Sequence, residues 1–494
     1  MISNGFEAVG SEDTKELLES IMEFKPYKAQ TADEAFEIDK ESKMDMIDMT
    51  KPYFLGMSYL NEKYPCENDK KAFEYVEKEE PLKKTLLYDK HVALKARMAP
   101  FAGYSMPVWY SGINDEHNAM RTSAGLFDVG HMGILSFEGP DACRFIDTLT
   151  SNYIPKLLNG QSQYGYLLDA FGKVIDDIML YKRAEDKFML VVNAANFDKV
   201  KRYLKGVVDG EYFLDSECKS KEIHKRVTIK DLSAEEAGKD RKADLAFQGP
   251  KSQEVLALLL DDVERKRFLQ LKKNEFIETK IKDKDVIISR TGYTGEDVGY
   301  ELYLNPNDSI KMWDLILEVG KDFGVKPCGL GCRDSARTEA GLPLYGHELA
   351  GVYGISPNEA GYAPFVKFHK PFFVGRRALL EAEKTRKMEL VRFSLVNKNA
   401  RPIKHGSVLV SKRGETMGYV TSSVIINGWQ VGFAYVSKKH TAPGTRAEVF
   451  ILGGKNTEKQ KDQLKPGDRI LLSEEAVIMT RFPSKEEFEE RYNR

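Results

Sequence analysis

Several kinds of segment are missing from this chain of 494 residues. No apolar run approaches about 18 residues, which argues against a membrane-spanning helix. Lys plus Arg number 74 and Asp plus Glu number 76, so the net charge is −2 and no basic excess indicates a nucleic-acid partner. The N-terminus is polar and acidic, without the basic start and apolar stretch of a signal peptide. We therefore expect a cytoplasmic protein that binds neither nucleic acid nor membrane.

Cysteine is scarce as well: the five residues are Cys66, Cys143, Cys218, Cys328 and Cys332. An odd number in a long chain argues against a disulfide framework and for a reducing compartment. Cys328 and Cys332 are spaced C-x3-C, and no second Cys or His pair lies at a zinc-like spacing. We interpret the two as small buried thiols and expect no metal site.

The common cofactor and nucleophile motifs are also absent. No G-x-G-x-x-G follows a strand, and the chain has no P-loop, no H-E-x-x-H and no G-x-S-x-G elbow. His131 and His347 lie in Gly-rich contexts without a ligand-spaced partner, which favours a structural or substrate-orienting role over metal binding. Any chemistry must therefore rest on carboxylates, Arg, Tyr and a bound cosubstrate.

Composition divides the chain into three parts. Residues 1–86 form an acidic extension, which we predict to be helical because a capping box occurs at 31–34 and a charged helical pattern at 68–80. Residues 87–385 alternate short apolar strands with amphipathic helices, which is typical of an α+β fold. Residues 386–494 contain short strands broken by Gly and Lys-rich turns, which predicts a small all-β domain, barrel or sandwich.

The middle part contains an internal echo. "FEGPDACRFIDTL" at 137–149 resembles "FQGPKSQEVLALL" at 247–259, and each reads as a strand end, a Gly-Pro turn and an amphipathic helix. Chance similarity of a common turn is the alternative. The echo favours two related α+β subdomains, at about 87–215 and 216–385.

Two adjacent acids stand in the apolar stretch "GKVIDDIML" at 172–180. Side chains alternate between the two faces of a strand. The residues predicted to share the face of Asp177 are Ile175, Met179 and Tyr181, and those predicted on the face of Asp176 are Val174, Ile178 and Leu180. A carboxylate among apolar neighbours is costly unless it is paired or functional. The stretch therefore marks a candidate site.

Four further segments combine polar groups with Gly-rich, sharply turning backbone, at 101–112, 125–133, 290–302 and 329–349. Such clusters either make tight turns or let a ligand approach the backbone. Together with Asp177 they indicate a central pocket.

These segments resemble the aminomethyltransferase family, the T-protein of the glycine cleavage system. Residues 101–133 match the pattern "FAG…MPV.Y.G…EH.A.R..AGLFDV.HMG" nearly throughout, and "SRTGYTGED" and "KPCGLGCRDSARTEAGLPLYGHEL" match as closely. The resemblance covers roughly residues 87–445. It implies two related α+β subdomains plus a C-terminal β-barrel-like domain around a central folate channel. The acidic extension at 1–86 and a long loop at 208–243 depart from the family pattern.

The resemblance also implies an activity in glycine catabolism and one-carbon metabolism. Such enzymes take an aminomethyl group from the lipoyl arm of a carrier, the H-protein, and use tetrahydrofolate as cosubstrate. Their products are ammonia, 5,10-methylenetetrahydrofolate and the dihydrolipoyl carrier. We therefore expect a transferase whose partners are the lipoylated H-protein and folate.

By resemblance, Asp177 matches the catalytic aspartate. For Asp176 a structural role is favoured. A carboxylate on a rigid strand can orient the folate amine, stabilise developing positive charge and accept a proton. The residues implied for folate binding are Glu301, Arg333, Tyr164, Tyr293 and Asn193.

Two of these assignments leave alternatives open. Glu301 is the last residue of "GEDVGYE", where the family reads "GEDGFE", so the extra Val298 leaves its register open. A carboxylate in that place would accept two neighbouring N–H groups of a pterin. The competing interpretation is a surface acid after a turn. Arg333 suits a carbonyl or the carboxylates of folate; the competing interpretation is an ion pair with Asp334 or Glu339.

Other functions within the superfamily are alternatives. One is a tetrahydrofolate-dependent demethylase that acts on a small methylated sulfonium or amine. Another is a non-enzymatic, folate-binding assembly factor of iron–sulfur metabolism. That branch carries a "KGCY.GQE" signature, whereas residues 370–379 read "KPFFVGRRAL", without the Cys.

Overall fold

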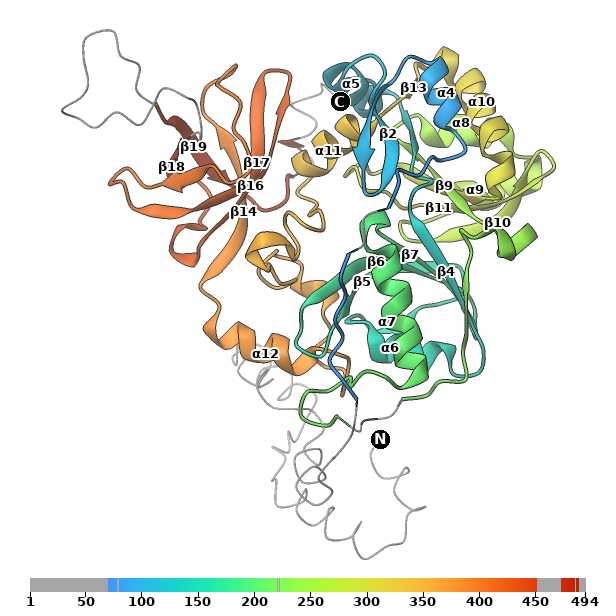
Figure 1. Ribbon diagram of the computed structural model, residues 1–494. Helices are drawn as coiled ribbons and strands as arrows, with labels where there is room; N and C mark the ends of the chain where they lie inside the picture. The colour runs from blue at the N-terminus through green and yellow to red at the C-terminus, as the bar shows by residue number, and fades with distance from the viewer. Residues whose placement is uncertain are drawn as a thin grey trace, which may run out of the picture.

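Two α+β layers and a β-barrel surround a common centre in the computed structural model (Figure 1). The structure describes residues 70–77, 80–219, 221, 223–450, 472–484 and 486–487. Most of the acidic extension, residues 1–69, lies outside the described residues and so does the polar stretch 453–468.

The first sheet has five antiparallel strands in the order β5-β6-β7-β4-β8. Their bounds are Gln161–Leu168, Val174–Ala184, Lys187–Val192, Gly133–Glu138 and Thr228–Asp231. Helices α6 (Ala142–Leu149) and α7 (Phe197–Asp209) cover one face and bury a continuous apolar cluster against it (Figure 1). The apolar stripes of both helices are what hold them there.

The second sheet has six strands in the order β10-β11-β12-β9-β3-β13. Their bounds are Phe276–Ile281, Lys284–Ser289, Gly299–Leu304, Ala243–Gln248, Gly125–Asp128 and Lys326–Pro327. Helices α8 (Ser252–Leu259), α9 (Asp262–Leu269) and α10 (Ser309–Gly320) bury a second apolar cluster on one face. The uncovered faces of the two sheets pack together through Ile134, Tyr181, Met189, Val191, Phe276, Ile287, Leu232 and Tyr303.

The internal echo is confirmed in three dimensions. In each copy a strand, β4 or β9, is followed directly by a glycine with positive φ and then by a helix, α6 or α8. The φ angles are +137° at Gly139 and +128° at Gly249. A Cβ at Gly249 would lie 2.3 Å from the carbonyl oxygen of Met120, so only glycine fits this turn.

The predicted subdomain boundary between residues 215 and 216 does not coincide with the division of the strands between the two sheets. Strand β3 comes early in the chain but joins the second sheet, beside β9. Strand β8, at 228–231, lies beyond the boundary but pairs with β4 of the first sheet. The two subdomains therefore exchange strands, which a boundary drawn along the chain does not represent.

Residues 70–77 are extended, so the charged helix predicted over 68–80 is wrong in this part. Lys71 pairs with residues 211–213: its N–H donates to Glu211 O (3.0 Å), and its carbonyl accepts from Phe213 N–H (3.1 Å). The ring of Phe73 packs against Tyr203 and Tyr212 with centroids 4.9 and 5.2 Å apart. Tertiary pairing and burial of Phe73 outweigh the weak local helical propensity.

The third body is a closed barrel in the order β14-β17-β16-β15-β18-β19. The strand pattern left barrel and sandwich open, and the resemblance implied the barrel. The strands, in chain order from β14, are Met388–Leu395, Val408–Val410, Thr416–Ile426, Trp429–Ser437, Arg446–Phe450 and Glu474–Met479. The remaining elements are α4 (Tyr88–Ala93), β1 (Arg97–Phe101), β2 (Tyr104–Trp109), α5 (Ile113–Thr122), α11 (Leu330–Glu339) and α12 (Arg376–Thr385). Closure leaves the barrel without a free sheet edge.

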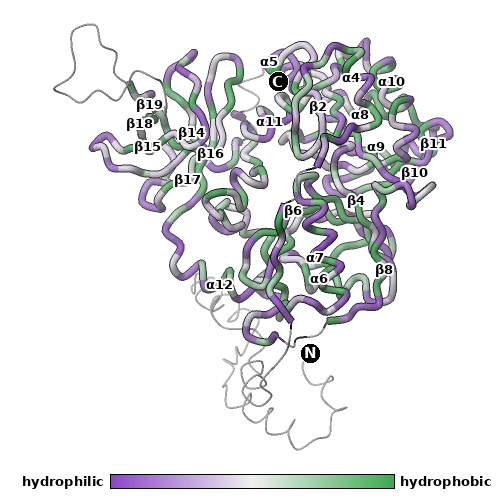
Figure 2. The backbone as a smooth tube through the Cα atoms, in the orientation of Figure 1, coloured by the Kyte–Doolittle hydropathy of each residue, from purple (hydrophilic) through white to green (hydrophobic). Residues whose placement is uncertain are grey.

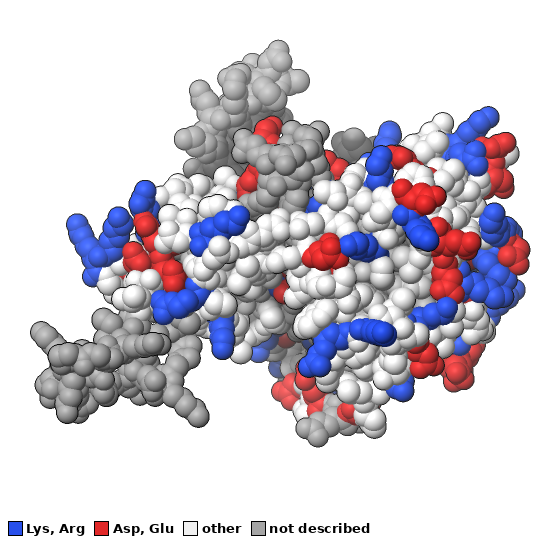
Figure 3. Space-filling model, turned by 90° about the horizontal axis from the view of Figure 1, so that it is seen from above, with Lys and Arg blue, Asp and Glu red and all other residues white. Residues whose placement is uncertain are grey.

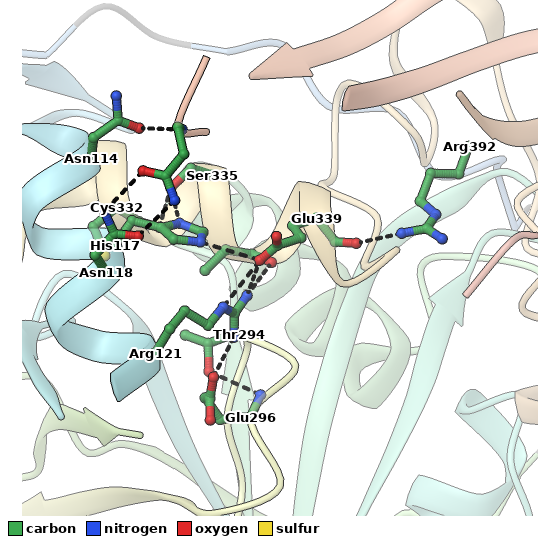
Figure 4. Close-up of polar contacts among 12 residues, drawn as sticks. Asn114, His117, Asn118, Arg121, Thr294, Glu296, Cys332, Ser335, Glu339 and Arg392 are labelled. Atoms are coloured by element: carbon green, nitrogen blue, oxygen red, sulfur yellow. Dashed lines mark hydrogen bonds and ion pairs between the residues drawn. The ribbon is translucent and has the colours of Figure 1, made fainter. Parts of the chain in front are cut away.

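A buried ionic junction at Glu339, the last residue of α11, connects α5, the second sheet and the barrel (Figure 4). The Glu339 carboxylate accepts from Arg121 Nε (3.0 Å) and lies 3.2 Å from His117 Nε2, both on α5. Arg121 also pairs with Glu296 at 2.6 Å. Arg392 of β14 donates to the Glu339 carbonyl (3.0 Å). His117 and Arg121 of α5 therefore link α11 to Glu296, between β11 and β12 of the second sheet, and Arg392 links α11 to the barrel.

Hydropathy follows this layering. Hydrophobic segments run along the inner strands, whereas hydrophilic ones lie mainly at outer turns (Figure 2). On the face shown in Figure 3, acidic and basic side chains are interspersed. Surface ion pairs of the described residues include Lys90 with Asp314 (2.5 Å). Cys328 and Cys332 are buried free thiols, as predicted. No helix in the described part of the chain is long and apolar enough to cross a membrane.

Candidate functional site

A cavity of about 690 Å³ lies where the two sheets meet the segment from α11 to residue 365. This volume is within the range of small-molecule sites. Strands β5 and β6 form one wall, the loop and strand from 290 to 303 form another, and α11 with residues 342–347 form a third. All six residues singled out in the sequence line it: Tyr164, Asp177, Asn193, Tyr293, Glu301 and Arg333.

A β-bulge at Ile175 shapes the first wall. The β5–β6 register pairs Leu167 with Asp176 and then Leu168 with Val174, so Ile175 has no partner. Alternation holds beyond the bulge, where Met179 and Tyr181 share the face of Asp177. Before the bulge the predicted faces are wrong: Ile175 joins the cluster under α6 and α7, and Val174 packs on the other side. The extra residue of a bulge shifts the alternation by one.

Asp177 is held at the cavity wall by two donors. The Tyr164 hydroxyl donates to its Oδ2 (2.9 Å), and the Asn193 amide Nδ2 donates to its Oδ1 (2.8 Å). Burial raises the pKa of Asp177, while these two hydrogen bonds act in the opposite direction. Burial and the adjacent Asp177 carboxylate keep the pKa of Tyr164 well above its usual range, so the phenol remains a donor. The site thus presents a carboxylate of fixed orientation.

Asp176 faces the opposite side and is fully buried. It accepts from the backbone N–H of Asn193 (2.8 Å) and from the side-chain amides of Asn193 (2.9 Å) and Asn196 (2.5 Å). Burial and repulsion from Asp177 raise its pKa, and the amide donors oppose this rise. Asp176 therefore fixes Asn193, which in turn bonds Asp177, as a structural role requires.

Glu301 lies on the opposite wall, in the middle of β12, so the extra Val298 does not remove it from the cavity. Its Oε2 accepts from the Thr291 hydroxyl (2.6 Å), the Tyr303 hydroxyl (3.1 Å) and the Tyr181 hydroxyl (3.3 Å). No described group bonds to Oε1. One oxygen is anchored and the other is available to a ligand.

Arg333 projects from α11 into the same cavity. The alternative ion pairs are not formed, because Asp334 pairs with Arg337 (2.7 Å) and Glu339 with Arg121 (2.9 Å). The Nη1 of Arg333 is buried and has no partner in the described part of the chain. Its guanidinium lies 5.0 Å from the ring centre of Tyr293, whose hydroxyl donates to Pro343 O (2.5 Å).

The aromatic side chain of Tyr164 is part of a cluster at the cavity floor. Its ring contacts Tyr166, Tyr362 and Phe365 edge-on, with centroids 5.3, 5.9 and 5.0 Å apart. Tyr164 therefore belongs to this aromatic cluster and also donates a hydrogen bond to Asp177.

Sequence reasoning missed one acid, Asp244 of β9. It is 2% exposed and lines the cavity, and its Oδ1 has no partner among the described residues. The signal was present, since "ADLAFQ" sets a lone acid in an apolar strand as "VIDDI" does. His131 also lines the cavity; burial lowers its pKa to about 4, so the imidazole is neutral.

The arrangement suits a flat, polar heterocycle more than a metal ion. In the described part of the chain, no three His, Cys, Asp or Glu side chains are grouped so that they could hold a metal. The cavity instead offers rigid carboxylates on two walls, a guanidinium and tyrosine rings. Such a set can hold an N–H edge, pack aromatic faces and move a proton.

Comparisons with known proteins agree with this geometry. The family model of the GCVT N-terminal domain matches residues 87–370. The aminomethyltransferase of Caldanaerobacter subterraneus subsp. tengcongensis is 40% identical over 374 residues, which are 75% of this chain and 92% of that protein. That of Lysinibacillus sphaericus is 39% identical over 376 residues, 75% of this chain and 94% of that protein.

A solved structure is similar over nearly its whole length. The crystal structure of glycine cleavage system aminomethyltransferase T from Bartonella henselae has a TM-score of 0.64 and 28% sequence identity. The match covers 81% of this chain and 97% of that chain.

Proposed function

Because the chain belongs to the GCVT family, we propose that it transfers an aminomethyl group from a lipoylated H-protein to tetrahydrofolate. The chain is an aminomethyltransferase, an enzyme that depends on tetrahydrofolate. The proposed products are 5,10-methylenetetrahydrofolate, ammonia and the dihydrolipoyl carrier. The observation that carries this proposal is Asp177, fixed by Tyr164 and Asn193 on the wall of the central cavity.

The residues of the cavity fit a reduced folate. A pterin displays a 2-amino group beside a ring N–H, and Glu301 Oε1 carries no hydrogen bond from any described group. The buried Nη1 of Arg333 and Oδ1 of Asp244 also lack partners within the described residues, so the cavity has polar groups prepared for a ligand. The edges of Tyr164 and Tyr293 provide aromatic contact for the pterin or aminobenzoyl ring.

Asp177 is the group placed for the chemical step. Bound tetrahydrofolate supplies a nucleophilic amine that takes up the one-carbon unit. The Asp177 carboxylate orients that amine, stabilises the positive charge that develops on it and accepts its proton. Tyr164 and Asn193 keep the carboxylate in one orientation, so no reorganisation is needed during the reaction.

Glu301 and Arg333 hold the cosubstrate. The Glu301 carboxylate, anchored by Thr291, accepts from the pterin N–H edge and sets the orientation of the ring. The guanidinium of Arg333 donates to a carbonyl or carboxylate of folate. Asn193 acts through Asp177, which it bonds at 2.8 Å.

The H-protein as donor is supported by the family, whose model matches residues 87–370. The deciding experiment supplies tetrahydrofolate with either aminomethyl-lipoyl H-protein or a small methylated amine or sulfonium. Ammonia plus methylenetetrahydrofolate from the first donor is the expected result. Methyltetrahydrofolate from a methyl donor, without reaction of the H-protein, would instead identify a demethylase.

A further inference from the structure

Asp244 is a buried acid that the proposed reaction has not used. Its side chain is 2% exposed, lines the cavity and leaves Oδ1 without a hydrogen bond among the described residues. It also takes part in no ion pair there. An unpartnered buried carboxyl costs free energy, which indicates that a ligand completes its hydrogen bonding.

Asp244 and Glu301 are neighbours across two strands. The β9–β12 register pairs Asp244 with Tyr303 and Ala246 with Glu301, so the two acids lie diagonally on one face. Diagonal neighbours in a sheet are about 7–8 Å apart between Cα atoms, within reach of one small heterocycle. Both side chains line the same cavity.

The surroundings of Asp244 favour its neutral form. Burial and the nearby Glu301 carboxylate raise the pKa of Asp244 well above its usual range. The Arg333 guanidinium opposes the rise, and the Asp128 carboxylate adds to it. A neutral carboxyl group differs from a carboxylate in one decisive way, because it can donate a hydrogen bond.

A tetrahydropterin presents three polar groups in a row: the 2-amino group, the N3–H and the 4-oxo oxygen. The first two are donors and match the Glu301 carboxylate, whereas the third is an acceptor and needs a donor beside Glu301. We propose, on the premise of folate binding set out above, that Asp244 determines specificity for the 4-oxo pterin by donating its carboxyl proton to that oxygen.

This assignment has a consequence for ligand choice. A 2,4-diamino analogue carries an amino group at position 4 and an unprotonated N3, so it offers no acceptor to Asp244 and one donor fewer to Glu301. The enzyme should therefore prefer the 4-oxo cosubstrate over the 2,4-diamino analogue. The preference should depend on Asp244, whereas Glu301 should affect both ligands.

The test measures dissociation constants by calorimetry for tetrahydrofolate and its 2,4-diamino analogue. The proteins are the wild type, Asp244→Asn, Asp244→Val and the control Asp285→Val, whose acid is 84% exposed on the same sheet. Asn retains a donor, so Asp244→Asn should bind tetrahydrofolate nearly as the wild type does. Val has none, and a hydrogen bond contributes about 0.5–1.5 kcal/mol, so affinity should fall roughly two- to tenfold, with no change for the analogue.

Thermal unfolding checks that each variant is folded, and Asp244→Asn gives an answer even where Asp244→Val does not fold. Wild-type affinity for tetrahydrofolate in Asp244→Val would overturn the inference. An equal loss for both ligands in that variant would do so too, as would a loss in Asp244→Asn as large as in Asp244→Val. A wild type that binds no tetrahydrofolate would overturn the proposed function itself, which separates the two failures.

Discussion

Each of the two sheets carries a pair of acids, and the two pairs differ in how fully they are bonded. Asp177, Glu301 and Asp244 line the central cavity, whereas Asp176 faces away from it. In the first sheet, Asp176 and Asp177 receive donors from Tyr164, Asn193 and Asn196. In the second, Oε2 of Glu301 is anchored, but its Oε1 and the Oδ1 of Asp244 have no partner within the described residues.

This difference indicates that the first pair positions a reacting group and the second pair recognises a ligand. The first pair is complete before any ligand arrives, which is what a group that must act on a reacting atom requires. The second pair has open positions, which a ligand with matching donors and acceptors would fill. Variants on the two sheets should therefore change different kinetic constants.

The largest expected effect comes from Asp177→Asn. General acid–base help is worth about 10²–10⁴ in rate, so turnover should fall by roughly two or more orders of magnitude. Affinity for tetrahydrofolate should hardly change, because Asn has the same shape. Turnover at saturating substrate and a calorimetric Kd measure the two. Asp262→Asn, with an acid 88% exposed on α9, is the control. Full turnover in Asp177→Asn would remove this residue from the mechanism.

A smaller effect, on binding, is expected for Glu301→Ala. Hydrogen bonds to a charged group contribute about 1.5–3 kcal/mol, which corresponds to a Kd for tetrahydrofolate roughly ten- to a hundredfold weaker. Turnover at saturating folate should change little. Glu185→Ala, whose acid is 81% exposed, serves as control. An unchanged Kd in Glu301→Ala would rule out the pterin contact.

The smallest effect is expected for Asp176→Asn. This change weakens the support of Asn193, and one hydrogen bond is worth about 0.5–1.5 kcal/mol, so turnover should fall roughly two- to tenfold. Burial and the Asp177 carboxylate raise the pKa of Asp176 to about 8, so Asp176 is neutral while Asp177 ionises. The acid limb of the kcat/KM profile should therefore stay in place. A limb that moves to lower pH would show that Asp176 is charged beside Asp177.

Sequence patterns predicted the architecture where the signal was local. The echo at 137–149 and 247–259 identified the related halves, and the broken strands after 385 identified an all-β domain, which the structure shows to be a barrel. Alternation placed Met179 with Asp177 correctly but failed at Ile175, because a bulge depends on pairing with β5. Residues 70–77 have a helical pattern of charges, yet Phe73 packs against two distant tyrosines.

The candidate site was predictable residue by residue but not as a set of contacts. Motifs identified Asp177, Glu301 and Arg333, all of which line one cavity. The hydrogen bond from Tyr164 to Asp177 depends on the register of β5 and β6, which one sequence does not specify. Asp244 had the same signal as Asp177, an acid in an apolar strand, but lay outside a long motif.

The ionic junction at Glu339 has a consequence for where the chain could be truncated. The match to the family model ends at residue 370, before the first barrel strand. Yet α11, which carries Arg333 into the cavity, ends at a carbonyl that Arg392 of the barrel holds. A fragment truncated at the end of the matched region would keep every residue of the proposed chemistry and lose the support beneath one wall. The activity should therefore require the barrel as well as the matched region that carries the residues of the proposed chemistry.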